Sequence, residues 1–293
     1  MLTVFLRRTG FALLVLLGAG TVVALALSFV PDSTTDASTL ERWGTYLHVL
    51  LTFDYGIVDS VNRPMSTLLW GRGQVTLILI GGALSLMLAV GIPLGIGRAL
   101  RPESQVLEWT AGIAHVLSSI PILVWAFGLL ALSTAAFGVA PSFLNLEGAG
   151  GAEVFLIYAA PTVSLAFGDG ILSDIIRHVR SEAEQEVDQT YVRALRARRA
   201  PVVRHMWRGI VGPVFTVVSN KIAYLISGTI VVEYVFSFKG LAYQVYDAIE
   251  STKEYEVVLA ATVLFVAVTV LLKLLSEFVA LLADPRLRTA QTS

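Results

Sequence analysis

Long apolar runs alternate with short polar segments along this chain of 293 residues. A bilayer core about 30 Å thick needs roughly 20 residues in a helix, because backbone polar groups cannot stay unpaired in lipid. Three runs reach this length without a charge: 9–31, 73–97 and 109–146. They predict transmembrane helices, the third of which leaves the membrane near Pro141.

Three further apolar runs contain or border a charge. Residues 154–168 lead into Asp169, residues 210–232 include Lys221, and residues 257–282 include Lys273 and Glu277. Cytoplasmic segments are enriched in Lys and Arg, so the basic residues decide whether these runs span the membrane. With six spans and both termini in the cytoplasm, the inner segments carry 14 basic residues and the outer segments 5. The pattern predicts an all-α polytopic protein of the plasma (inner) membrane with six transmembrane helices.

Composition supports a membrane protein. The chain is 55% hydrophobic and 15% charged with a mean hydropathy of +0.73, whereas soluble proteins carry about a quarter charged residues. Its net charge of -1 offers no field that would attract nucleic acid. The absence of cysteine excludes disulfides and thiolate chemistry, and the sequence shows no P-loop, H-E-x-x-H or G-x-S-x-G. We expect no enzymatic activity, no cofactor and no metal site.

The N-terminal part has two interpretations. Residues 1–33 resemble a signal peptide, but the apolar core is longer than the usual 7 to 15 residues, which favours a first transmembrane helix. In the outer segment that follows, apolar residues at helical spacing predict an amphipathic helix: Leu40, Trp43, Leu47, Leu50 and Leu51. We therefore divide the chain into residues 1–69, a transmembrane helix with an extracytoplasmic segment, and residues 70–290, a five-helix core.

The core contains an arginine-rich cytoplasmic loop at about residues 181–204. Eight arginines and no lysine lie between Ile176 and Gly209. Residues 181–200 lack Gly and Pro and predict a short helix ending at Pro201, with one apolar side formed by Val187, Tyr191, Ala194 and Leu195. Its apolar edge can rest on the anionic inner leaflet or dock into a partner protein. Four acidic residues in the same loop favour the partner, because anionic head groups would repel them.

At this loop the chain resembles the inner-membrane permease subunits of ABC importers for dipeptides, oligopeptides and nickel. Residues 190–199 read TYVRALRARR against the family's D-Y-I-R-T-A-R-A-K-G, and residues 205–209 read HMWRG against H-x-L-R-N. Further matches follow in order: FDYG at 53–56, GIPLG at 91–95, SIP at 119–121, VEYVFSFKGL at 232–241, EYEVV at 254–258 and DPR at 284–286. Together these motifs cover nearly the whole chain.

The resemblance implies a type I ABC importer permease of MetI-like architecture. Such a subunit pairs in the lipid bilayer with a homologous second permease, while two cytoplasmic ATPase subunits supply energy and an extracytoplasmic substrate-binding protein delivers the solute. The matching loop forms the coupling helix, which docks in a groove of the ATPase. The resemblance carries this role onto six residues: Tyr191, Arg193, Ala194, Leu195, Arg196 and Ala197.

The expected cargo is a dipeptide or oligopeptide, with nickel or another small solute as the alternative. A stand-alone channel or secondary transporter is a competing class. It would require internal repeats or ionisable residues that converge from several spans, and the sequence shows neither apart from Lys221.

The chain departs from the family pattern after the coupling helix. Arg199 stands where family members have a glycine, and the spacing from Tyr191 to His205 is about four residues shorter. A non-glycine residue takes a left-handed turn at a cost of around 1 kcal/mol. We therefore expect this turn to differ. Lys239 and Glu256 also replace expected prolines.

Lys221 lies in the middle of the fifth predicted span. A lysine there costs about 2.5 to 3.5 kcal/mol on insertion scales, so it needs water or a counter-charge. It can meet a cargo carboxylate on the translocation path, or pair structurally with Asp169 or with an acid of a partner subunit. Ser219, Asn220 and Lys221 are accordingly our translocation-path candidates. For Lys273 and Glu277 we expect a local ion pair.

Overall fold

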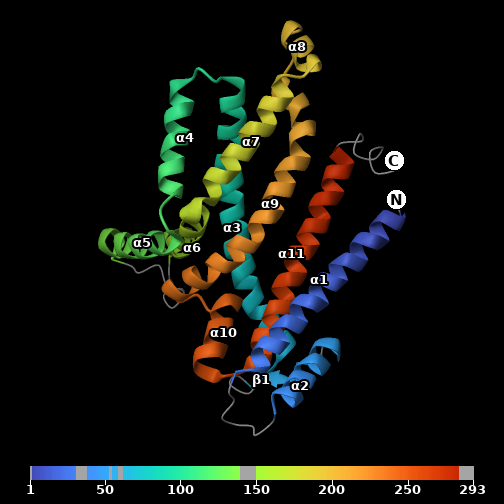
Figure 1. Cartoon of the computed structure of the whole chain (residues 1–293). Coiled ribbons are helices and arrows are strands. Elements are labelled where there is room, and N and C mark those ends of the chain that lie inside the picture. The colour runs from blue at the N-terminus through green and yellow to red at the C-terminus, as the bar shows by residue number, and fades with distance from the viewer. Residues whose placement is uncertain (1, 31–37, 53–54, 59–61, 139–149, 284–293) are drawn as a thin grey trace. The chain divides into compact units, whose positions relative to one another are not determined.

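The computed structural model describes residues 2–30, 38–52, 55–58, 62–138 and 150–283. These residues are almost entirely helical (Figure 1). The helices are α1 (Leu2–Ser28), α2 (Thr39–Thr52), α3 (Met65–Leu100), α4 (Gln105–Ser118), α5 (Ile122–Phe137), α6 (Gly151–Phe167), α7 (Ile171–Val187), α8 (Thr190–Ala197), α9 (Val202–Val235), α10 (Leu241–Asp247) and α11 (Tyr255–Ala283). The short helical turns η2 (Gly168–Gly170) and η3 (Ala248–Thr252) and a hairpin of β1 (Ile57–Val58) and β2 (Arg63–Pro64) complete the list.

The prediction of an all-α membrane protein is confirmed. Within the described ranges, four helical segments are long and apolar enough to cross a membrane: Met65–Leu100, Ile157–Val187, Gly209–Val235 and Tyr255–Leu275. The bent pair α4 and α5 makes a fifth if it forms one span, and Leu13–Ser28 is a shorter apolar helix. The count of six spans stays a prediction.

Two predicted spans are interrupted. The third breaks between α4 and α5, which meet at 96° on either side of Pro121, a residue that cannot donate a backbone hydrogen bond. The fourth breaks at η2, where Asp169 has φ 56° and Gly170 has φ 79°. The two breaks lie against each other: the N–H of Ile122 donates to Asp169 Oδ1 at 3.1 Å, and the N–H of Asp169 donates to the carbonyl of Ile120 at 3.3 Å.

The chain forms two compact units, which we describe separately. The first comprises residues 1–77 and 238–271. Its core joins α1, α2 and the start of α11, and includes Ala24, Leu50, Val257 and Leu259. The predicted amphipathic helix is present as α2. Of its predicted stripe, Leu50 is buried and Trp43 and Leu47 are partly buried, whereas Leu40 and Leu51 are exposed. Ser38 and Glu41 cap α2 reciprocally: the N–H of Ser38 donates to Glu41 Oε2 at 2.8 Å, and the N–H of Glu41 donates to Ser38 Oγ at 3.3 Å.

The second unit comprises residues 78–237 and 272–293. Its centre is the antiparallel pair α7 and α9, which α8 connects (Figure 1). The C-terminal half of α3 packs closely on α7, because Gly91 and Gly95 leave space for Ile175 and Val179. The helices α7 and α9 carry the charged residues Asp174, Arg177 and Lys221.

Candidate functional site

The arginine-rich loop folds differently from the single helix predicted over residues 181–200. Residues 181–187 continue α7, because Ala183 belongs to the same buried face as Ile176 and Val179. The helix then stops, and Gln189 adopts an extended conformation (φ -65°, ψ 142°) before α8 begins. The loop therefore presents a separate helix of eight residues, Thr190–Ala197, at the end of the α7 and α9 pair.

One residue of α8 is buried, and most of the others are exposed. Val192 is fully buried and anchors the helix to its own chain, a contact that the apolar pattern did not single out. Leu195 is half-buried. The other five predicted coupling residues are all exposed: Tyr191, Arg193, Ala194, Arg196 and Ala197. We call these five residues the coupling face.

Glu186 joins α8 to both long helices. The hydroxyl of Tyr191 donates a hydrogen bond to Glu186 Oε2. The other carboxylate oxygen, Oε1, lies against Gly209 of α9, where a Cβ atom would overlap with it. A glycine at 209 is therefore required if the carboxylate is to sit between α7 and α9. Sequence reasoning missed this role of Glu186, because nothing in the spacing places residue 209 opposite residue 186.

The turn after α8 has a non-glycine residue in the left-handed conformation. Arg199 adopts φ 54°, the left-handed conformation that a glycine would favour. The N–H of Ala200 donates to the carbonyl of Leu195 at 3.0 Å, and the N–H of Arg199 donates to that of Arg196 at 3.1 Å. These two bonds form a Schellman C-cap. Arg199 thus takes the left-handed conformation that a glycine would favour, and the expectation that the turn as a whole differs from the family's stays a prediction.

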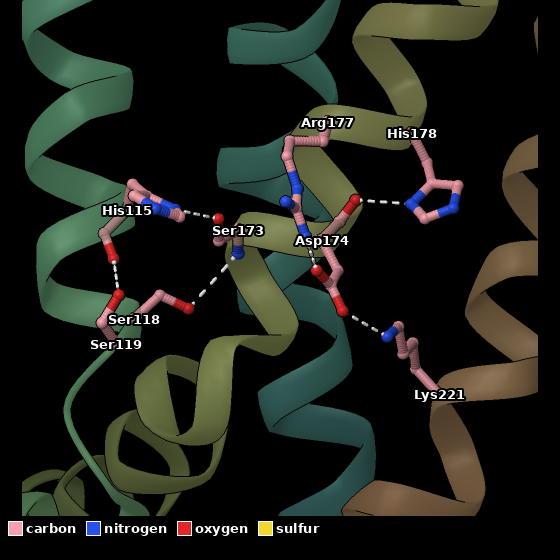
Figure 2. A network of polar contacts seen from close by, with 8 residues as sticks. All are labelled: His115, Ser118, Ser119, Ser173, Asp174, Arg177, His178 and Lys221. Carbon is pink, nitrogen blue, oxygen red and sulfur yellow. Dashed lines mark hydrogen bonds and ion pairs between the residues drawn. The ribbon is translucent and has the colours of Figure 1, made fainter.

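A polar network joins the first turn of α7 to the middle of α9 (Figure 2). Lys221 Nζ of α9 donates to Asp174 Oδ2 of α7 at 2.5 Å, and Arg177 bonds the other carboxylate oxygen. The predicted pairing of Lys221 with Asp169 is wrong, because Asp169 lies at the η2 break and binds the backbone of Ile122. The counter-charge comes instead from the helix that follows the break.

Neighbouring contacts extend this network to α4. Nδ1 of His178 lies 2.8 Å from the carbonyl of Asp174. On the other side of α7, Ser173 forms a hydrogen bond with Nδ1 of His115, and the N–H of Ser173 donates to Ser118 Oγ at 3.3 Å. Neighbouring residues of α7 thus bind two different helices: Ser173 contacts α4, and Asp174 contacts α9.

The three translocation-path candidates differ in exposure. Ser219 is buried and donates to the carbonyl of Thr216 at 2.9 Å, so it faces its own helix. Lys221 is largely covered, with 17% of its side chain exposed. Asn220 is exposed and belongs to an exposed polar stripe along α9 that consists of Thr216, Asn220, Tyr224 and Ser227. These positions follow one helical face at spacings of four, four and three residues.

Two other predictions about sites are not decided. The side chain of Glu277 lies outside the described residues, so its ion pair with Lys273 stays a prediction. In the part of the chain that is described, no three His, Cys, Asp or Glu residues are grouped so that they could hold a metal ion.

Comparison with known proteins places these features in a family. The family described as "binding-protein-dependent transport system inner membrane component" matches residues 91–289. The nickel import system permease protein NikB of Staphylococcus aureus (strain USA300) is 25% identical over 257 residues, which cover 86% of this chain and 74% of that protein. A Brucella suis biovar 1 protein whose name describes it as a peptide permease is 28% identical over 240 residues, 79% of this chain and 74% of its own length.

The family match includes both interrupted spans, the coupling face and the Asp174 network. It accounts for the apolar helices, since members are multi-pass components of the inner membrane. The chain thus belongs to the binding-protein-dependent transport system inner membrane component family and is a permease subunit of an ABC importer.

Proposed function

We propose that this permease imports dipeptides or oligopeptides together with a homologous second permease, two cytoplasmic ATPase subunits and an extracytoplasmic binding protein. The observation that supports it most strongly is the coupling face, an open surface of apolar and arginine side chains on a helix held at the end of α7 and α9. ATP hydrolysis then belongs to the separate ATPases, and this chain is not an enzyme.

The coupling face docks into the ATPase groove. Movement of the ATPase reaches the membrane helices because Val192 and the bond from Tyr191 to Glu186 fix α8 to α7, and Glu186 contacts α9 at Gly209. Alternating access requires this firm attachment, because the ATPase can move the transmembrane helices only if α8 moves together with them.

Charge reversal tests the docking. Arg196→Glu should reduce transport-coupled ATP hydrolysis in the reconstituted importer at least tenfold. Arg204→Glu is the matched control, because it reverses an equally exposed arginine on the first turn of α9, outside the coupling face. Equal losses in both variants, or unchanged ATPase association and coupling in Arg196→Glu, would argue that the loop lies on lipid.

The coupling face should lie in the cytoplasm with both termini. The chain has no cysteine, so single-cysteine variants report topology directly. Thr45→Cys on α2 should react with an impermeant maleimide in intact spheroplasts, whereas Ala197→Cys should react only after permeabilisation. The reverse labelling pattern would overturn this orientation.

The peptide assignment draws on the name of the Brucella relative, and nickel is the alternative that the Staphylococcus relative supports. Mass spectrometry of the ligand carried by the binding protein that co-purifies with this permease separates the two. Peptide in the binding protein supports the proposal, and a nickel chelate replaces it.

A further inference from the structure

The network around Asp174 carries an excess of positive charge. One carboxylate is shared by Lys221 and Arg177, so the three side chains have a formal net charge of +1 (Figure 2). Among the described residues, the guanidinium of Arg177 makes one hydrogen bond, to Asp174, and its side chain is 67% exposed. Most of its five donors are therefore available to another group.

On the α9 side, the cluster lies within an apolar segment. Lys221 is the twelfth residue after Gly209, where the apolar segment of α9 begins, and at 1.5 Å per residue this is about 18 Å along the helix. Asp174 is bonded to Lys221, and Arg177 is less than one turn further along α7. An exposed guanidinium beside an apolar helical segment is costly in lipid, so its face borders water or a polar group.

The adjoining surface of α9 is polar as well. Asn220 and Tyr224 are exposed, and the ring of Tyr224 lies 5.2 Å from Lys221 Nζ. Thr216 and Ser227 extend the same stripe in both directions. An apolar span that exposes a continuous polar stripe beside a cationic cluster has the surface expected along a path for a polar solute.

We infer that Arg177 and Lys221 form a binding site for a carboxylate of the transported peptide. The planar guanidinium matches a carboxylate with two parallel hydrogen bonds, and Lys221 supplies a second charge from the opposite helix. Asp174 holds both cations in place and reduces the net charge of the cluster to +1. The carboxylate of the peptide neutralises this remaining charge. This inference rests on the proposed peptide transport and adds a site to it.

The test compares two cargoes in the assembled importer. Vesicles containing both permeases, the ATPases and the binding protein are supplied with dialanine and with dialanine amide, and uptake of each is measured by mass spectrometry. Binding of each compound to the isolated binding protein is measured in parallel. The uptake ratio is then divided by the affinity ratio of the binding protein, so that the selectivity of the permease remains. Wild type should favour the free carboxylate. Arg177→Gln should lower the ratio of acid to amide uptake about tenfold, Lys221→Met should lower it less, and Arg177→Lys should retain part of it.

Arg180→Gln is the matched control, because it removes a charge from the same helix but from a pair with Glu184. It should leave the ratio unchanged. An unchanged ratio in Arg177→Gln would overturn the site while leaving peptide transport intact. Loss of the sister permease on purification of Arg177→Gln would instead assign Arg177 to an acid of that subunit. Absence of uptake of both compounds by wild type would remove the peptide assignment and this site together.

Discussion

Two carboxylates on α7 connect it to its neighbours, and their surroundings differ. Glu186 accepts a hydrogen bond from the neutral hydroxyl of Tyr191 and packs against Gly209. Asp174 instead forms ion pairs with Lys221 and Arg177. The separation is 12 residues on each helix, from Asp174 to Glu186 on α7 and from Gly209 to Lys221 on α9, so one antiparallel register makes both contacts. Near water a carboxylate can remain charged with neutral partners, but within an apolar span it requires compensation.

Removing one member of the central pair should have the largest effect. Asp174→Leu leaves Lys221 and Arg177 without a counter-charge within the spans, and we expect about 3 kcal/mol of destabilisation. Thermal unfolding in detergent and the amount of membrane-inserted protein measure it. The double variant Asp174→Leu with Lys221→Met should recover most of the loss. A double variant as unstable as the single one would show that Asp174 acts through packing instead of charge.

Gly209→Ala should disturb the other contact. The added methyl group displaces the carboxylate of Glu186 and breaks its bond with Tyr191, at an expected cost of about 1 to 2 kcal/mol. Coupling of ATP hydrolysis to transport should fall with stability. Glu186→Ala in the same chain makes space for the methyl group, so it should restore stability but not coupling. Recovery of both would contradict a role of Glu186 in holding α8.

Arg199→Gly should stabilise the turn after α8 by about 0.5 to 1 kcal/mol, since glycine takes a positive φ without steric penalty. Slower hydrogen exchange of the Arg199 and Ala200 amides would report this gain. Arg198→Gly is the control, because residue 198 has φ -88° and glycine there should be neutral or destabilising. Faster exchange in Arg199→Gly would mean that the arginine side chain, and not the backbone, secures the turn.

The smallest effect concerns a third carboxylate, fully exposed at the start of α2. The backbone N–H of Ser38, with its hydroxyl, lowers the pKa of Glu41 below the ordinary value of 4.5. The cap is therefore fully present above pH 4.5 and is lost as the pH falls through the lower folded-state pKa. Hydrogen exchange of the first amides of α2 should accelerate in that range. In Glu41→Gln the exchange should lack this acid-dependent step, and a retained step would assign it to another group.

The sequence predicted what depends on local pattern. Apolar run length located the long helices, whereas the spacing over residues 181–200 predicted one helix where the structure has the end of α7 and a separate α8. It did not predict that Asp174 would bind Lys221. That pairing depends on the register of α7 against α9, which joins residues 47 positions apart and has no local signal in the sequence. Val192 was missed for a related reason, because burial of one side of an eight-residue helix is decided by its neighbours.

The contact between the two broken spans has a mechanical consequence. Asp169 accepts a hydrogen bond from the N–H of Ile122 and donates one to the carbonyl of Ile120. A Cβ atom at Gly168 would overlap with Ile122, so the two breaks pack closely. The two interruptions are thus one corner shared by α4, α5, α6 and α7. Because the two breaks are hydrogen-bonded to each other, we expect a displacement of α7 to move α4 and α5 together with α6.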